Sequence, residues 1–140
     1  MNRCVPDAST VAVAFFRERH AAKARSLLTS ETELHAPDLI AAELANVIWK
    51  RHRRREIDID EAGELLRDFQ SLPVSLTPSQ ELADVALELA LRTDRTVYDC
   101  LYVALAVRLN CPMITADKRL VNALSKTPLA DHVMWLGDLP

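Results

Sequence analysis

The sequence contains only two glycines among 140 residues, and aromatic residues make up 5 % of it. Because no glycine-rich loop is present to cradle nucleotide phosphates, nucleotide-dependent chemistry is not expected. With so few aromatic rings, base stacking is not expected to be the main source of affinity for a nucleic acid. The scarcity of glycine and the absence of low-complexity segments also argue against flexible linkers. We therefore expect a single domain that spans residues 1–140.

Long apolar runs and paired cysteines are also absent. Cys4, Cys100 and Cys111 are odd in number and widely scattered, which is typical of reduced thiols in a cytosolic protein. The first residues contain no apolar signal-peptide core, and no apolar run reaches the roughly 18 residues that a membrane span requires. We expect a soluble, cytoplasmic protein that does not associate with a membrane.

Charge is balanced, with a formal net charge of -3, so the overall charge does not favour a nucleic acid or a membrane surface. The one dense basic cluster is the basic run, residues 50–55 (KRHRRR). Cations at the end of a predicted helix are stabilised by its dipole, and we slightly favour this interpretation. The alternative is a phosphate-binding arm. Four further cations close in sequence to Asp99 or Asp117 are equally suited to contact a nucleic-acid backbone or to be ordinary surface charges: Arg92, Arg95, Lys118 and Arg119.

Short apolar segments alternate with longer helical patterns, which predicts an α/β fold with a mainly parallel sheet. Strands are expected at residues 3–7, 33–36, 73–76, 112–115 and 133–136. Helices are expected to begin at residue 9 or 10, 21, 37, 58 or 60, 78, 99 and 118, and to end near residues 16, 28, 54, 71, 92, 109 and 124. The third helix is expected to carry Pro37 in its first turn, where proline is well tolerated.

Four acidic residues stand inside or beside apolar segments: Asp7, Glu43, Asp99 and Asp117. Carboxylates are rarely buried unless they are paired or bind a metal. Asp7 and Asp117 each follow a predicted strand, and ligands bind at the carboxyl ends of parallel strands. Asp99 and Glu43 lie near the starts of predicted helices, from which both can face the same edge. The pattern therefore predicts one shared acidic site.

Each acid also has a simpler explanation. Asp7 and Asp117 are suitable N-caps for the helices that follow them. Asp99 in a first helical turn complements the helix dipole. Glu43 is harder to explain in this way, because most of its neighbours in the predicted helix are apolar. All four being coincidental caps is less plausible than one shared site.

Carboxylates so close together need a compensating cation. Two of them about 4 Å apart repel by roughly 4 kcal/mol at an effective dielectric near 20. Mg²⁺, or Mn²⁺ in its place, is a hard cation that prefers carboxylate and water ligands. Such a cation activates water and stabilises charge on a leaving oxygen, which suits phosphodiester hydrolysis. Three short polar side chains are candidates for orienting the acids or water, although each is equally suited to a cap or a buried hydrogen bond: Ser9, Asn46 and Thr115.

Four segments, in this order, resemble the PIN-domain family, and specifically the VapC toxins of bacterial and archaeal toxin–antitoxin pairs. They are residues 6–9 (PDAS), 37–46 (PDLIAAELAN), 98–106 (YDCLYVALA) and 114–117 (ITAD). The resemblance implies a three-layer α/β/α sandwich around a five-stranded parallel sheet. It also implies that the four acids form a Mg²⁺ site, with Asp7 and Asp99 as the foremost ligands. One departure is Pro6, which lacks a ladder donor and is expected to shorten or bend the first strand near Asp7.

Members of the family are Mg²⁺-dependent endoribonucleases, usually homodimers, that a cognate antitoxin holds inactive. The resemblance therefore implies an RNA substrate, an antitoxin partner and a homodimer. One alternative is a non-catalytic PIN-like module that binds RNA or protein. Another is a phosphotransfer receiver or an Asp-x-Asp phosphatase, which fits poorly because Asp7 has no acidic neighbour and Ser9 stands where the second aspartate is needed. Glu43 and Asp117 are the candidates for a general base.

Overall fold

The computed structural model describes residues 1–140 and contains a five-stranded parallel sheet of order β3-β2-β1-β4-β5. The strands are β1 (Arg3–Pro6), β2 (Glu33–Pro37), β3 (Val74–Thr77), β4 (Met113–Thr115) and β5 (Val133–Trp135). The helices are α1 (Ala8–Phe15), α2 (Ala21–Leu28), α3 (Leu39–Arg53), α4 (Ile59–Gln70), α5 (Ser79–Thr93), α6 (Val97–Leu109) and α7 (Lys118–Leu124). Two short 3-10 helices, η1 (Ala130–His132) and η2 (Leu136–Asp138), flank β5. Every predicted strand and helix is present, with ends that shift by one or two residues.

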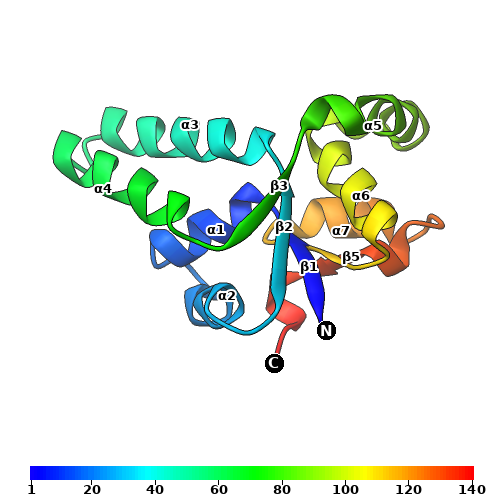
Figure 1. The fold of residues 1–140 in the computed structure, drawn as a ribbon, viewed down its shortest axis with the longest axis horizontal. Coiled ribbons are helices and arrows are strands. Elements are labelled where there is room, and N and C mark those ends of the chain that lie inside the picture. The colour runs from blue at the N-terminus through cyan, green and yellow to red at the C-terminus, as the bar shows by residue number, and fades with distance from the viewer.

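The helices form two layers, one on each face of the sheet. The chain runs from β1 through β2 to β3 in one direction across the sheet, and from β3 to β4 and β5 in the other. Because parallel crossovers are right-handed, this reversal places α1 to α4 on one face and α5 to α7 on the opposite face. Figure 1 shows this division, with the blue to green helices on one side of the strands and the green to orange helices on the other. The predicted three-layer α/β/α sandwich is confirmed.

Helix α6 is central to the core, which joins 32 buried residues. Its residues 100–106 are all buried, which explains why its sequence is apolar on every side. It packs against β1, β2 and β4, while α1 covers β1 and β4 from the other face. This packing fixes the start of α6, and with it Asp99, close to the ends of the central strands. No helix of the structure combines the length and the apolar character needed to cross a membrane.

β1 is short, as Pro6 predicted, because it ends at Pro6 and Asp7 is already the N-cap of α1. The amides of Val5 and Asp7 donate to carbonyls of the β4 segment, at N···O distances of 2.9 and 3.0 Å. Alternate residues along a strand bond to opposite neighbours, so Pro6 faces β2, and the pairing of β1 with β2 ends at Cys4. The missing donor of Pro6 therefore removes nothing from the β1–β4 ladder, and Asp7 is held in register.

Pro37 was expected in the first turn of a helix, but it is the last residue of β2 and pairs with Thr77 of β3. The following Asp38 does not cap its own helix. Its Oδ1 accepts hydrogen bonds from the amide and hydroxyl of Ser79, at 2.9 and 2.7 Å, and these bonds lower the pKa of Asp38. Asp38 thus ties the start of α3 to the start of α5.

Candidate acidic active site

Successive strands are added on opposite sides of β1, so the strand order reverses between β1 and β4. Open parallel sheets bind ligands at such a point, beyond the carboxyl ends of the strands. Asp7 directly follows β1, and Asp117 follows β4 by two residues. Asp99 lies in the first turn of α6 and Glu43 in the second turn of α3. These four residues, which we call the acidic site, therefore come from four elements to one edge of the sheet.

Asp7 is the most buried member, with 7 % of its surface exposed. Its Oδ1 accepts the hydroxyl of Ser9 at 2.6 Å and the amide of Thr10 at 3.0 Å, so it does act as the N-cap of α1. Its Oδ2 accepts the hydroxyl of Thr115, from the end of β4, at 2.6 Å. Burial nevertheless raises the pKa of Asp7, and the three hydrogen bonds only oppose this rise. Asp7 is therefore both a helix cap and a carboxylate held at an energetic cost.

Glu43 is half-buried and accepts a hydrogen bond at Oε1 from the hydroxyl of Tyr102 in α6. Burial is the main cause that raises the pKa of Glu43, and the neighbouring charges of Asp7 and Asp99 raise it further. Such coupling requires these carboxylates to be near one another, although they are separated by 36 residues or more along the chain. Glu43 is therefore not a solvated surface acid.

Asp99 and Asp117 share one cation. A terminal nitrogen of Arg95, Nη2, lies 3.4 Å from Oδ2 of Asp99 and 3.7 Å from Oδ2 of Asp117. Burial and the charge of Asp117 raise the pKa of Asp99, whereas Arg95 lowers it. The other oxygen of Asp117 accepts the amides of Arg119 and Leu120, at 3.0 and 3.3 Å, so Asp117 also caps α7. Oδ1 of Asp117 is thus used by α7, whereas its Oδ2 faces Arg95 and the acidic site.

The three polar candidates differ in their surroundings. Ser9 and Thr115 both contact Asp7, and Ser9 Oγ also accepts the amide of Ala116 at 3.0 Å. Asn46, by contrast, is exposed and makes no hydrogen bond to the acidic site. The inward face of α3 is set by Leu44 and Ile48, which leaves Asn46 on the solvent side. The structure therefore brings Asn46 into no hydrogen bond with the acidic site, and its orienting a water molecule stays a prediction.

The donor set fits a hard divalent cation in its chemistry, because it consists of carboxylates from four elements. Arg95 is the one cationic side chain paired with them, and it contacts only Asp99 and Asp117. No three of the His, Cys, Asp and Glu side chains converge closely enough to hold an ion as they stand. The guanidinium of Arg95 supplies positive charge between two of the acids instead. A cation held by Asp7, Glu43, Asp99 and Asp117 would take over that compensation.

The basic run lies away from the acidic site. At about 1.5 Å per residue, Arg51 is roughly 12 Å along α3 from Glu43. Arg51 forms ion pairs with Glu18 and with Glu56, and its guanidinium lies over the Phe16 ring, 4.4 Å from its centroid. These contacts support the interpretation of the run as the stabilised end of a helix.

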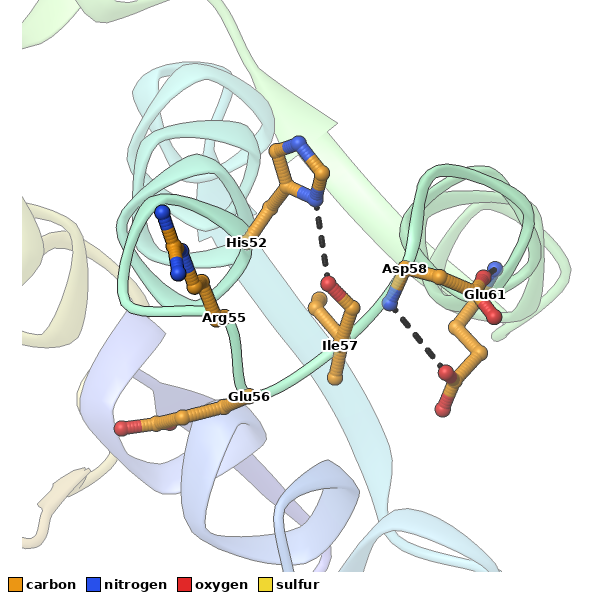
Figure 2. A pocket seen from close by; sticks show the side chains of 6 residues that line it. All are labelled: His52, Arg55, Glu56, Ile57, Asp58 and Glu61. Atoms are coloured by element: carbon orange, nitrogen blue, oxygen red, sulfur yellow. Dashed lines mark hydrogen bonds between the residues drawn. The ribbon is translucent and has the colours of Figure 1, made fainter.

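The turn after the basic run contains a cavity of about 410 Å³. Figure 2 shows its lining, which comes entirely from the short stretch 52–61. His52 Nδ1 is 3.0 Å from the Ile57 carbonyl oxygen, and Asp58 and Glu61 form a capping box at the start of α4. Its polar groups are thus used by the turn itself, and none of the four acids contributes to it.

Comparison with known proteins agrees with this architecture. The family model described as "PIN domain" matches residues 4–124. The chain belongs to the PIN-domain family. The match spans β1 to α7 and includes all four acids. This confirms the resemblance that the sequence segments suggested.

The curated relatives of this PIN domain include Ribonuclease VapC3 of Pyrobaculum aerophilum, 37 % identical over 122 residues, which cover 84 % of this chain and 92 % of the relative. Ribonuclease VapC9 of Mycobacterium tuberculosis is 33 % identical over 116 residues, which cover 83 % of this chain and 87 % of that protein.

Solved structures show the same fold at lower identity. PAE2754 from Pyrobaculum aerophilum superimposes with a TM-score of 0.71 at 20 % identity, covering 96 % of this chain and 90 % of that one. VapBC2 from Rickettsia felis, bound to a promoter DNA fragment, gives a TM-score of 0.65 at 11 % identity and covers 95 % of this chain and 98 % of that one.

Two residues of this PIN domain's site make contacts with the acids that the sequence alone does not reveal. Tyr102 was treated as part of an apolar helix, although a buried tyrosine hydroxyl needs a partner and Tyr102 is three residues after Asp99, on the same side of α6. Arg95 is predicted from the sequence to contact the RNA backbone or to be an ordinary surface charge, and the structure shows in addition that it bridges two acids. Helical spacing from Asp99 indicates Tyr102, whereas Arg95 precedes α6 and its contact with Asp117 depends on the tertiary structure.

Proposed function

We propose that this PIN domain is a metal-dependent endoribonuclease of the toxin–antitoxin type. The observation that carries the proposal is that four acids from four elements lie at one edge of a parallel sheet, beside its strand-order reversal, and that burial raises the pKa of three of them. The names of its relatives support RNA as the substrate, since proteins 37 % and 33 % identical to it are called ribonucleases.

The residues proposed to hold Mg²⁺, or Mn²⁺ in its place, are Asp7, Glu43, Asp99 and Asp117. When bound, such a cation polarises water and phosphate oxygens and stabilises charge on the leaving oxygen. The protein's part is to hold the carboxylates in place. Asp7 is oriented by three donors, so its position is set before any cation arrives. This preorganisation reduces the ordering that binding requires.

Glu43 is the carboxylate that we propose accepts the proton of the attacking water. Its Oε1 is fixed by Tyr102, which leaves Oε2 free to accept that proton. Asp117 is less suited, because Oδ1 is used by the start of α7 and Oδ2 is near Arg95. With a cation compensating the acids, Arg95 would be available to contact the phosphate.

The decisive experiment measures RNA cleavage by the purified protein without any partner. Total RNA is incubated with Mg²⁺, with Mn²⁺ and with EDTA, and metal binding is followed separately by calorimetry. Cleavage that requires the metal supports the proposal. A folded protein that binds Mn²⁺ and cleaves none of a broad set of RNAs would contradict the ribonuclease assignment, and the absence of metal binding would contradict the shared site.

A non-catalytic module that binds RNA or protein is the second candidate. It is favoured by the bridge that Arg95 forms between Asp99 and Asp117, because this bridge compensates their charge without a metal. Competition separates the two. If Mn²⁺ binds this PIN domain and Arg95→Gln tightens that binding, the bridge is a substitute for the cation, whereas the absence of Mn²⁺ binding from both proteins favours the non-catalytic module.

We further propose that the protein acts in the cytoplasm with a cognate antitoxin and forms a homodimer. The three free, buried cysteines support the cytoplasm as the compartment. The solved VapBC2 structure supports an antitoxin partner. For the third, Leu87 and Leu91 lie one turn apart on α5 and are 52 % and 78 % exposed. Light scattering of the wild-type protein and of Leu91→Glu tests the dimer, which we expect the glutamate to dissociate.

A further inference from the structure

A second cavity lies next to the acidic site, on its β5 side. It has a volume of about 250 Å³, and three separate segments line it: the turn between α1 and α2, the turn between β4 and α7, and the end of β5. Ala116 and Lys118, the two neighbours of Asp117, both contribute to its wall. Trp135 pairs in register with Thr115, the residue that donates to Asp7. The cavity, which we call the tryptophan pocket, is thus level with the acids at the same edge of the sheet.

The Trp135 ring is held in a fixed place in this pocket. It lies so close over Gly137 that a Cβ atom there would come within 2.3 to 2.6 Å of three ring carbons, so only glycine fits. The Nζ of Lys23 donates to the Gly137 carbonyl at 2.6 Å and anchors the turn that follows β5. The ring of His20 meets the Trp135 ring almost at right angles, with centroids 5.3 Å apart. A ring held this firmly is suited to stacking.

Positive charge gathers around this ring, although the whole chain is acidic. The Nζ of Lys118 lies 4.3 Å from the Trp135 ring centroid, and Arg19 also lines the pocket. The one acid in the wall, Glu18, is paired with Arg51 and adds little free negative charge. The Nε2 atom of His20 is buried without a hydrogen-bond partner. The pocket thus combines an aromatic ring with two cations.

This combination matches one nucleotide of a single strand, because a base stacks on an aromatic face while cations hold its phosphate. We infer that the tryptophan pocket is a substrate subsite that takes one nucleotide of single-stranded RNA beside the scissile bond. The base lies on Trp135, and the ammonium of Lys118, on its flexible side chain, moves from the ring to the phosphate. This inference rests on the proposed ribonuclease function and places its substrate at a second point.

Fluorescence tests the subsite without any cleavage. Trp49, 51 % exposed on α3, is the second of two tryptophans, so Trp49→Phe leaves Trp135 as the sole reporter. In EDTA, which prevents metal-dependent hydrolysis, the protein is titrated with a single-stranded RNA oligonucleotide of mixed sequence and with an abasic strand of equal length. We expect saturable quenching by the first and little by the second, since only the first carries bases.

Variants then assign the cations. Lys118→Ala and Arg19→Ala are expected to weaken binding of the oligonucleotide by roughly tenfold, with a shallower salt dependence. Lys126→Ala is the matched control, because Lys126 is exposed, follows α7 and does not line the pocket. Gly137→Ala, which displaces the Trp135 ring, is expected to abolish the quenching. If this variant does not fold, Trp135→Phe in otherwise wild-type protein replaces it, and the loss of affinity is then measured by the anisotropy of labelled RNA.

Three results would overturn the inference: no saturable quenching, equal quenching by the abasic strand, or equal effects of the Lys118 and Lys126 variants. Quenching by an acidic or aromatic peptide but not by RNA would assign the pocket to a protein partner and likewise overturn it. Cleavage with Mg²⁺ is measured separately on the wild-type protein. If cleavage is intact while RNA does not quench the Trp135 fluorescence, only the subsite proposal fails. If cleavage is absent while Trp135 responds to RNA, only the proposed catalytic function fails.

Discussion

The acidic site and the basic run are the two concentrations of charge in this PIN domain, and they are built in opposite ways. The four acids are separated in the sequence, come from four elements and include a carboxylate that is 7 % exposed. The basic run is continuous in the sequence, lies at the end of one helix and faces largely toward solvent. Solvated charges at a helix end cost the fold little, whereas buried carboxylates reduce stability. Charge that is retained at such a cost is the better indicator of function.

The largest expected difference between the two regions is in catalysis. Asp99→Asn is expected to lower RNA cleavage on the order of 10³-fold, because it removes a charged ligand worth several kcal/mol of transition-state stabilisation. Asp94→Asn is the matched control, since Asp94 is exposed, ends α5 and has a positive φ of 57°, which asparagine tolerates. Initial rates at saturating Mg²⁺ test both, and comparable losses in the two variants would contradict the special role of Asp99.

Tyr102→Phe tests how far the acidic site depends on its supports. Loss of the hydroxyl frees Oε1 of Glu43, and we expect cleavage to fall roughly 10- to 100-fold, as for other residues that orient ligands. Tyr98→Phe, on the same helix but 61 % exposed, should leave the rate unchanged. Calorimetry with Mn²⁺ should show weaker binding for the first variant alone. Equal metal affinities and rates for the two variants would exclude a positioning role for Tyr102.

Asp7→Asn sharpens the comparison through stability, and its effect depends on pH. Burial raises the pKa of Asp7 in the native state above its ordinary value of 3.8, which applies to the unfolded chain. Between the unfolded-state pKa and the native-state pKa, the unfolded chain therefore releases a proton that the native state retains. Stability therefore falls as pH rises through this window, and the full penalty is present above the native pKa. Asparagine carries no charge and caps a helix about as well as aspartate.

We accordingly expect Asp7→Asn to raise Tm at pH 8 in EDTA and to have little effect near pH 3.5, while cleavage is lost. The hydroxyl of Thr115 can reverse from donor to acceptor and so accommodate the new amide. Thermal unfolding at a series of pH values gives the answer. A variant less stable than wild type at pH 8 would show that the hydrogen bonds of Asp7 outweigh its burial.

Asp58→Ala probes the turn that follows the basic run, where the Asp58 and Glu61 carboxylates form the capping box of α4. The Asp58 side chain accepts the Glu61 amide at 2.8 Å, and the Glu61 carboxylate accepts the Asp58 amide in return (Figure 2), which completes the capping box. We expect a loss of about 1 kcal/mol in the free energy of unfolding and an unchanged cleavage rate. Asp58→Asn, which keeps an acceptor, should recover most of the loss. A large fall in activity without a fall in stability would assign the turn a function that its geometry does not indicate.

The smallest effect is expected for the basic run itself. Arg53 and Arg54 are exposed, and Arg53 only covers the Trp49 ring at 5.4 Å. Replacing both by alanine should change stability by about 0.5 kcal/mol or less and cleavage by about twofold or less. Lys118→Ala serves as the comparison, because it lines the tryptophan pocket. If the double variant loses more RNA affinity than Lys118→Ala, the run is the phosphate-binding arm after all.

The sequence by itself determined the order and type of every helix and strand, because apolar periodicity and cap residues are local signals. It also indicated the four acids, since a charge embedded among apolar neighbours is visible without a structure. The edge at which they meet followed from the rule for parallel strands.

Only the tertiary structure decided what surrounds those acids. The hydroxyl of Tyr102 reaches Glu43 across 59 positions, and Thr115 reaches Asp7 across 108. Arg95 bridges two acids, and Asn46 turns to solvent, because side-chain direction depends on how each helix is rotated against the sheet. Pro37 ended a strand instead of opening a helix for the same reason, as pairing with Thr77 outweighed a local preference. Local sequence fixes dihedral preferences, but which groups share a buried space is settled by the packing of distant segments.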